Sequence, residues 1–359
     1  MTEETSQDQI EIPENTVMFL IGAGCSAEAG VRMASAMVSD IEQFVVTDSQ
    51  WKPFRNLYNY LKSSILFADG IFGRFPNTIN VERLLVVISE LAEKEKNGLY
   101  PFVGGWNDRL LNLAGEGFQN LKSFKTRISS QLFEWINIPN YSDAQYYRGF
   151  ADFKKEIGYP IRIFSFNYDL CLEHAVGDVE IELGFDPQTL TWGYTNFEFN
   201  ENKDVGIYLY KLHGSIDWLR DHAQGNTLTK AANPVTGAEL IFGTSAKLTS
   251  IDPYLFYVFE FRKYSLMDEC KLIIVIGYSF EDEYMNKLMA QSLATTPNRK
   301  VLIVGPDPSP LKAKFVREND VNPDQVDLAN ATASDFLLNQ LKKDVIYSRL
   351  PEQEDSAFT

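Results

Sequence analysis

Val17-Met-Phe-Leu-Ile-Gly-Ala-Gly-Cys-Ser-Ala-Glu-Ala-Gly30 runs five apolar residues straight into a glycine-rich turn. The apolar run, Val17 to Ile21, predicts a strand that is covered on both faces. Gly22, Gly24 and Ala27 then match the spacing G-x-G-x-x-[G/A]. This spacing is typical of a turn that lets the backbone approach the pyrophosphate of a dinucleotide. Any tight turn between a strand and a helix also favours glycine, so the rest of the chain must decide.

The small residues that follow, Ser26 to Gly30, predict the start of a helix. The N–H groups of its first turn would face the phosphates, with Gly22, Ala23 and Gly24 wrapped around them and Ser26 donating a hydrogen bond. Cys25 lies in the same predicted cofactor-binding turn. Since no His or Lys stands beside it in the sequence, we interpret its thiol as a packing group and not as a nucleophile.

Composition limits the class of protein. The chain has 359 residues, with 45% hydrophobic and 23% charged residues, which is typical of a folded chain of one or two domains. Its net charge of −16 argues against broad binding to nucleic acid or anionic membranes. No apolar run approaches the roughly 20 residues of a membrane span, and the N-terminus does not resemble a signal peptide. We expect a cytoplasmic location.

The periodicity along the chain predicts three parts. Residues 36–154 carry apolar residues at helical spacing, as in Val38, Ile41 and Val45, and predict a helical insertion. The remainder of residues 14–350, that is 14–35 and 155–350, predicts the α/β core of a single catalytic domain. Residues 1–13 and 351–359 are polar and acidic and predict flexible tails.

Four further runs predict strands, each of which ends in polar residues or glycine: Pro160–Asp169, Gly206–Ser215, Lys271–Ser279 and Lys300–Asp307. Helical segments separate several of them, and strands that alternate with helices predict a parallel, doubly wound sheet. Ligands of such sheets bind beyond the carboxyl ends of the strands. The motifs at these ends should therefore converge on one site.

These motifs resemble those of the sirtuin-like superfamily. The glycine turn resembles its first NAD-binding motif, Asn167 and Asp169 resemble its N-x-D motif, and His213-Gly resembles its catalytic His-Gly. Gly277 and Ser279 resemble its later G-x-S motif. The resemblance implies a Rossmann-like fold, and it is closer to the bacterial sirtuin-like branch, whose members typically hydrolyse NAD in antiphage defence.

The resemblance also implies roles for single residues. Asn167 and His213 would be catalytic, and NAD+ would be the substrate. The remaining cofactor-binding positions would be Asp169, Gly277, Tyr278, Ser279, Gly305 and Asp307, the last two near the adenosine. The three cysteines, Cys25, Cys171 and Cys270, cannot form the four-cysteine zinc ribbon of sirtuin deacylases, so no metal is expected.

Chemistry alone supports the two catalytic assignments. Breaking the nicotinamide–ribose bond builds positive charge at the ribose C1′. The amide of Asn167 can orient a water or a ribose hydroxyl without adding charge, and the imidazole of His213 can exchange a proton near neutral pH. Asn167 and Asp169 also suit a helix cap, as does Asp282. We expect structural roles for His174 and His222, and a solvent- or helix-facing role for the pair Glu82 and Arg83.

Several alternatives remain open. The chain could be an ADP-ribosyltransferase or deacylase, or a sensor that binds NAD or ADP-ribose and gates a partner enzyme. The resemblance further implies a homo-oligomer and a separate regulatory partner, such as a HerA-type hexameric ATPase. The aromatic residues of the insertion are either an assembly surface or core: Trp51, Phe54, Tyr58, Tyr60, Phe67, Phe72 and Phe75.

Overall fold

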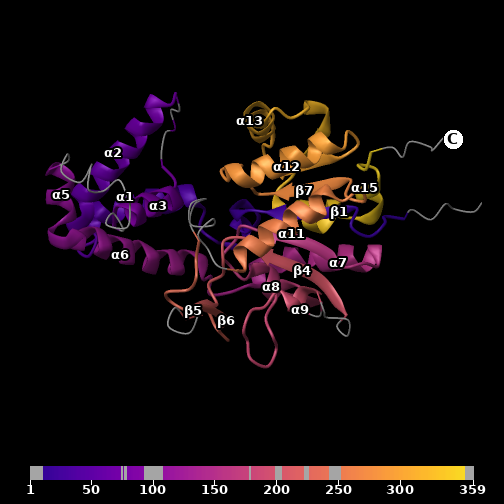
Figure 1. The fold of residues 1–359 in the computed structure, drawn as a ribbon, viewed down its shortest axis with the longest axis horizontal. Coiled ribbons are helices and arrows are strands. Elements are labelled where there is room, and N and C mark those ends of the chain that lie inside the picture. Colours follow the sequence, from indigo (N-terminus) through magenta and orange to yellow (C-terminus); the bar gives the residue numbers. More distant parts are fainter. Residues whose placement is uncertain are drawn as a thin grey trace, which may run out of the picture.

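A computed structural model describes residues 11–73, 76, 79–92, 108–177, 179–198, 204–221, 226–241 and 252–351 (Figure 1). Its centre is a seven-stranded sheet in the order β3-β4-β2-β1-β7-β8-β9, in which every described pair of neighbours is parallel. The fold is therefore the predicted α/β class, a doubly wound parallel sheet with a helical insertion.

The strands of the sheet, with a separate antiparallel hairpin of β5 and β6, have these bounds: β1 Val17–Ile21, β2 Ile161–Ser165, β3 Glu180–Glu182, β4 Val205–Lys211, β5 Trp218–Asp221, β6 Thr227–Lys230, β7 Leu272–Ile276, β8 Lys300–Gly305 and β9 Val326–Asn330. All five strands predicted from the sequence are present, and they occupy consecutive central places in the sheet. β1 and β7 are buried throughout, as their unbroken apolar runs require.

The described helices have these bounds: α1 Ala34–Thr47, α2 Arg55–Ile71, α3 Val81–Ala92, α5 Asp108–Ala114, α6 Gln119–Ile136, α7 Arg148–Ile157, α8 Cys171–Ala175, α9 Thr195–Glu198, α11 Tyr254–Leu266, α12 Glu283–Thr295, α13 Ser309–Asn319, α14 Ala333–Asp335 and α15 Lys343–Tyr347. α11, α12 and α13 contact one another in that order and form one layer, and α7 contacts α15 in another. The sheet is thus enclosed between helices (Figure 1).

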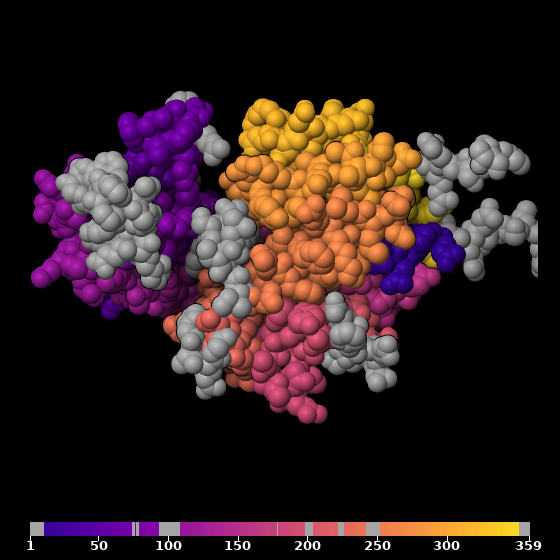
Figure 2. Space-filling view, in the orientation of Figure 1, coloured from indigo at the N-terminus to yellow at the C-terminus, as the bar shows by residue number. Residues whose placement is uncertain are grey.

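The helices α1 to α6 form a second hydrophobic cluster with residues of its own, among them Val38, Ile41, Leu84, Leu85 and Ile88. Figure 2 shows this layer, in indigo to purple, as a lobe at one end of the molecule, away from the C-terminus marked in Figure 1. The predicted apolar faces of this region are confirmed as buried.

The predicted insertion runs to residue 154, but its last part packs elsewhere. The 3-10 turn η6, Ser142–Tyr147, and helix α7 contribute Tyr147, Phe150 and Phe153 to the cluster of the sheet. The rings of Phe150 and Phe153 lie edge-on to Phe19 of β1, with centroids 5.1 and 5.9 Å away. We therefore propose that the separate helical layer ends near Ile136.

The sequence also predicted a helix from Ser26 to Gly30, and this prediction is wrong. Two 3-10 turns, η1 at Ala23–Cys25 and η2 at Ala27–Ala29, follow β1, and the first α-helix begins only at Ala34. Gly30 ends η2 with a φ of 93°, a left-handed conformation that glycine adopts without a steric penalty. The run of small residues thus serves a tight turn and not a helix.

The predicted tails lie mostly outside the described residues. Residues 11–13 are described, and Ile12 is buried in the cluster of the sheet. Of the aromatic residues in the insertion, Trp51 and Tyr58 are core, whereas Phe67 and Phe72 are exposed and Phe75 lies outside the described residues. In the part of the chain that the structure describes, no helix is long and apolar enough to cross a membrane.

Arg299, which no sequence pattern singled out, is fully buried between two helix ends. Its guanidinium donates to the carbonyl oxygens of Met267, Cys270 and Ser292, at 2.6, 2.8 and 2.6 Å. These carbonyls lie at or near the ends of α11 and α12, where the helix dipole favours a cation. The guanidinium therefore fastens these two helices to the start of β8.

We predict that Arg299→Ala lowers the free energy of unfolding by about 3–5 kcal/mol, because it leaves buried carbonyls unpaired and opens a cavity. Urea denaturation measures the change. The control, Arg317→Ala, removes the same group from an exposed position of α13 and should change stability by less than about 0.5 kcal/mol. Equal stability of the two variants would contradict the assigned role.

Candidate functional site

The five predicted motifs meet at one edge of the sheet, because their strands are parallel neighbours in the order β4-β2-β1-β7-β8. Backbone hydrogen bonds continue past the strand ends and join one motif to the next. Phe166 donates to the carbonyl of Ile21 at 2.9 Å, Leu212 to that of Ser165 at 2.8 Å, and Gly22 to that of Ile276 at 3.0 Å. The predicted convergence of the motifs is confirmed.

The glycine turn after β1 packs directly on the turn after β7. The N–H of Gly24 donates to the carbonyl of Gly277 at 2.9 Å. A Cβ at Gly22 or Gly24 would lie 2.8–2.9 Å from backbone atoms of Gly277 or Tyr278, and a Cβ at Gly277 would lie 2.1 Å from the nitrogen of Cys25. Contact between two backbones therefore explains these glycines without any ligand.

The N–H groups of this turn are also largely used within the protein. Those of Gly22, Gly24, Cys25 and Ser26 donate to the carbonyls of Ile276, Gly277, Gly22 and Ala23. Four N–H groups of the predicted phosphate-binding turn thus have acceptors within the protein, and phosphate binding by this turn stays a prediction. Cys25 and Ser26 are fully buried, so their side chains line the interior.

Burial raises the pKa of the Cys25 thiol to about 12. The thiol therefore stays protonated at physiological pH and is not a nucleophile. This agrees with the interpretation of Cys25 as a packing residue, although the sequence also placed it in the cofactor-binding turn.

Asn167 lies in the buried space beneath these turns. Its Nδ2 donates to Oγ of Ser26 at 3.0 Å, and that oxygen shares a 2.7 Å hydrogen bond with the hydroxyl of Tyr147. The residue is 5% exposed, and its Oδ1 has no hydrogen-bond partner in the structure. A buried amide oxygen left unpaired is costly and calls for a ligand or a water.

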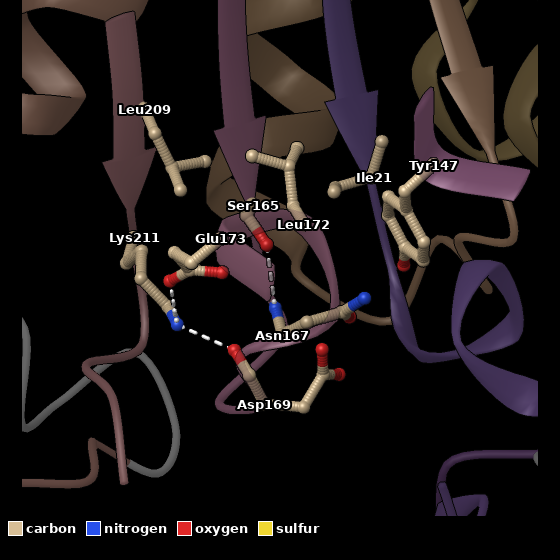
Figure 3. A pocket seen from close by; sticks show the side chains of 9 residues that line it. All are labelled: Ile21, Tyr147, Ser165, Asn167, Asp169, Leu172, Glu173, Leu209 and Lys211. Atoms are coloured by element: carbon tan, nitrogen blue, oxygen red, sulfur yellow. Dashed lines mark hydrogen bonds and ion pairs between the residues drawn. The ribbon is translucent and has the colours of Figure 1, made fainter. Parts of the chain in front are cut away.

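A small cavity opens onto Asn167 (Figure 3). It is lined by Ile21, Tyr147, Ser165, Asn167, Asp169, Leu172, Glu173, Leu209 and Lys211, and it has room for about one water molecule. In Figure 3 the amide of Asn167 points toward Tyr147 and Ile21. The cavity is thus polar at one end, where a water could satisfy the unpaired oxygen.

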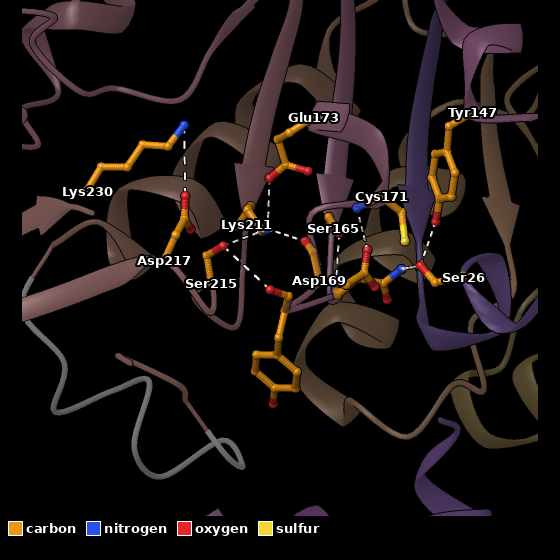
Figure 4. A network of polar contacts seen from close by, with 12 residues as sticks. Ser26, Tyr147, Ser165, Asp169, Cys171, Glu173, Lys211, Ser215, Asp217 and Lys230 are labelled. Atoms are coloured by element: carbon orange, nitrogen blue, oxygen red, sulfur yellow. Dashed lines mark hydrogen bonds and ion pairs between the residues drawn. The ribbon is translucent and has the colours of Figure 1, made fainter. Parts of the chain in front are cut away.

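Lys211 joins the motif after β2 to the motif after β4 (Figure 4). Its buried Nζ donates to the carbonyl of Asp169 at 2.6 Å, to Oγ of Ser215 at 2.8 Å and to Oε1 of Glu173 at 2.9 Å. A buried ammonium needs such a set of acceptors. Lys211 therefore fixes the loop that carries His213 against the segment that carries Asn167.

Asp169 has the capping role that the sequence left open. Its Oδ1 accepts a 3.0 Å hydrogen bond from the backbone nitrogen of Cys171 at the start of α8. Asp282 likewise caps α12, since its Oδ1 accepts from the nitrogen of Met285 at 3.1 Å. Both carboxylates also lie at the site, because Asp169 lines the cavity and Oδ2 of Asp282 is 3.8 Å from Nε2 of His213.

His213 is buried on the other side of the segment that follows β2. The residues that flank Asn167 both contact it: the ring of Phe166 lies edge-on with centroids 4.9 Å apart, and the hydroxyl of Tyr168 is 3.3 Å from Nδ1. Oε1 of Glu82 lies 3.9 Å from the same nitrogen. Arg83 pairs with Asp69 of the neighbouring α2, as predicted, and Glu82 is partly exposed. Glu82 also reaches His213, however, so α3 of the helical layer borders the site.

The remaining predicted residues are spread along the edge. Tyr278 stacks on Phe166 at 4.6 Å and donates its hydroxyl to Oδ1 of Asn286 at 2.9 Å, whereas Ser279 and Asp307 are exposed. Gly305 is buried, yet no atom lies within 4 Å of the position that its Cβ would take. This glycine, unlike those at the first turn, has open space in front of it.

Outside the centre of the site, the ring of His174 stacks on Tyr141 with centroids 3.9 Å apart, in line with its predicted structural role. His222 lies outside the described residues. Among the described residues, no group of three or more His, Cys, Asp or Glu side chains is placed to hold a metal ion.

Sequence reasoning did not assign Tyr147, Glu82 or Lys211 to the site. Lys211 lies in the predicted strand run Gly206–Ser215, after mostly apolar residues, and a lysine at such a place indicates a buried ion pair. No sequence pattern marks Tyr147 or Glu82 as a site residue, because each lies far along the chain from the residues that it contacts.

Residues 161–323 match the family of the SIR2-like domain. The match covers β2 to α13, including the motifs with Asn167, His213, Gly277 and Gly305, and supports a sirtuin-like family. No curated protein matches the chain.

Two solved structures are similar to this chain at low sequence identity. A Sir2 homologue in complex with NAD is 14% identical, with a TM-score of 0.45 over 92% of this chain and 90% of that chain. A mutant Sir2 homologue in complex with ADP-ribose is 12% identical, with a TM-score of 0.44 over 93% of this chain and 92% of that chain.

We predict that Gly277→Ala is more destabilising than Gly30→Ala. Both glycines have a positive φ, of 64° and 93°, but only the Cβ at Gly277 would collide with the facing backbone. Gly30→Ala should cost about 1 kcal/mol from backbone strain alone, and Gly277→Ala several times as much. Urea denaturation measures both values, and an equal loss would show that the contact of the two turns adds nothing.

Proposed function

We propose that this chain hydrolyses NAD+ at the bond between nicotinamide and ribose, releasing nicotinamide and ADP-ribose. The observation that carries the proposal is the unpaired Oδ1 of Asn167, which is buried at the carboxyl edge of the sheet beside a cavity of about one water. Its setting, within a SIR2-like domain that also carries His213-Gly, favours NAD over other ligands.

In the proposed reaction, water adds to the ribose C1′ as the bond to the nicotinamide nitrogen breaks. The electron pair of that bond stays with nicotinamide, which leaves as a neutral molecule. Asn167 orients the water, and His213, on the other side of the segment after β2, accepts through a ribose hydroxyl the proton that the water loses. The carboxylate of Asp169 lies beside Asn167 and that of Asp282 beside His213, and both favour the positive charge that develops on the ribose.

The open space at Gly305 supports a place for the adenosine end. The space adjoins the carboxyl end of β8, two strands from β1 in the sheet. In doubly wound folds a ligand extends along this edge from the place where the strand order reverses, which here lies between β1 and β7. We propose that Gly277, Tyr278 and Ser279 border the ribose and phosphates between the two ends.

We predict that Asn167→Ala and His213→Ala each lower the rate of NAD+ hydrolysis by at least about 100-fold, since water positioning and proton transfer each contribute that much. Release of nicotinamide and ADP-ribose is followed by chromatography. The matched control is His174→Ala, which removes an imidazole that stacks on Tyr141 away from His213 and should retain the wild-type rate.

The outcome separates the rival functions. Binding of ADP-ribose with no turnover of NAD+, under any condition, would overturn the hydrolase and favour a sensor. NAD+ consumption that requires an acyl-peptide or a protein acceptor would favour a deacylase or an ADP-ribosyltransferase.

We also predict that Gly305→Ala weakens the binding of ADP-ribose by about tenfold or more, because the methyl group fills space that the ligand needs. The substitution meets no protein atom, so the free energy of unfolding should stay the same or rise by up to about 1 kcal/mol. Gly193→Ala, whose Cβ would meet neighbours only at 3.7 Å, is the control. Calorimetric titration with ADP-ribose gives the affinity, and unchanged binding in Gly305→Ala would place the adenosine elsewhere.

The physiological role rests on the resemblance of the motifs. We propose a cytoplasmic effector that depletes NAD+ in antiphage defence. Such an activity is toxic, so it would be controlled through a homo-oligomer and a separate regulator such as a HerA-type ATPase.

A further inference from the structure

Glu82, on the helical layer, contacts the proposed catalytic histidine through a tyrosine. The hydroxyl of Tyr168 donates to Oε1 of Glu82 at 3.1 Å and lies 3.3 Å from Nδ1 of His213. The same hydroxyl is 3.0 Å from the carbonyl oxygen of Ile241. Four segments far apart in the chain, α3 and the segments after β2, β4 and β6, therefore meet at one hydroxyl group.

The hydroxyl has a single proton, which fixes the direction of these hydrogen bonds. Burial, and then the charge of Glu82, raise the pKa of Tyr168 well above its usual value, so the hydroxyl stays protonated. The carboxylate and the carbonyl can only accept, and one of them takes the proton of Tyr168. The contact with His213 then has to be made by an N–H at Nδ1 that donates to the phenolic oxygen.

We propose that Glu82 is a positioning residue that acts through Tyr168: it holds His213 with a proton on Nδ1 and stabilises the imidazolium that forms when Nε2 accepts a proton. This inference rests on the proposed function only for the catalytic use of that proton. The proton on Nδ1 leaves Nε2 as the basic nitrogen, and the negative charge 3.9 Å from Nδ1 favours the charged ring.

The other groups around the ring fit this arrangement. Asp282 faces Nε2 at 3.8 Å, and its carboxylate is fixed because the other oxygen caps α12. The hydroxyl of Tyr278 donates to Oδ1 of Asn286, and the buried Tyr254 has its hydroxyl beside Gly214, the residue after His213. Phe166 packs its ring edge-on against the imidazole. His213 thus lies between one carboxylate from the start of α12 and one from the helical layer.

The helix that supplies Glu82 is itself held from both sides. Val81, Leu84 and Leu85 are buried in the second cluster. The next residue in the chain, Arg83, pairs with the buried Asp69 of α2 at 2.5 Å. The position of the helical layer therefore sets the distance between Glu82 and His213, and any movement of this layer would change the basicity of the histidine.

The test compares Glu82→Gln with Glu90→Gln, the same change at an exposed position of the same helix. Glutamine still accepts from Tyr168 but carries no charge. For Glu82→Gln we expect kcat for NAD+ to fall about tenfold and the acid limb of its pH profile to move to lower pH by about one unit. KM and the affinity for ADP-ribose should change less than twofold. Glu90→Gln should match the wild type throughout.

A second readout does not need turnover. The chain has three histidines, so in protein labelled with 15N-histidine the signals of His213 are identified by comparison with His213→Ala. We expect a protonated Nδ1 and an unprotonated Nε2 in the neutral ring of the wild type. Tyr168→Phe should convert part of the population to the other tautomer, and in Glu82→Gln the ring should gain its second proton at lower pH.

A double variant tests whether Glu82 acts on His213 through Tyr168, an arrangement called here the Glu82–Tyr168–His213 relay. If Glu82 acts through Tyr168, Glu82→Gln adds little to the loss of kcat already caused by Tyr168→Phe, whereas independent effects multiply. If the wild-type protein does not turn over NAD+ but gives the expected 15N signals, the proposed function is wrong and the relay is supported. A neutral ring protonated on Nε2, or Glu82→Gln signals and kinetics equal to those of Glu90→Gln, would overturn the relay.

Discussion

The contact between two backbone turns, after β1 and after β7, is the constraint on which the rest of the site depends. The chain leaves β1 for one half of the sheet and returns at β7 for the other, so this is where the two halves meet. With Gly277 packed within van der Waals distance of Gly24 and Cys25, the turns approach more closely than any side chain allows. The 3-10 turn that follows β1 then carries Ser26 inward to Asn167.

Next to this contact, the side chains of residues 166–169, after β2, point alternately to two sides and form two groups. Asn167 and Asp169 face the cavity with Lys211, whereas Phe166 and Tyr168 face His213. The first group is buried, and Lys211 holds its backbone at Asp169. The other borders the helical layer, so its geometry depends on how that layer sits. A water-positioning amide and a proton-accepting imidazole are thus supported by different parts of the molecule.

The helical layer has its own hydrophobic cluster, yet it is not independent of the sheet. Tyr168, Leu170 and Ile216, from the segments that follow β2 and β4, are buried among its residues. These segments carry the N-x-D and His-Gly motifs. Packing forces within the layer therefore act on the loops of the site, which gives the insertion a physical means of influencing the chemistry. Its exposed Phe67 and Phe72 lie on α2 and just beyond it, away from this junction.

The sequence by itself determined the parallel sheet, its five central strands and the convergence of their polar ends. Largely apolar runs that end in glycine or polar residues predict these strands locally, because buried parallel strands need such runs. The edge strands were not predictable in the same way, since β3 has only three residues and apolar and polar residues alternate along β9. Composition also fixed the lack of a four-cysteine zinc site.

Only the tertiary structure decided what the site residues contact. From the sequence, glycine at positions 22, 24 and 277 is equally consistent with the approach of a phosphate or of another backbone. Only the tertiary structure shows that the neighbour is backbone. Likewise, Glu82 reads as an exposed helical residue until α3 is placed against Tyr168. Sequence patterns report periodicity over a few residues. Contacts across a hundred residues depend on how whole layers pack, and no local pattern records them.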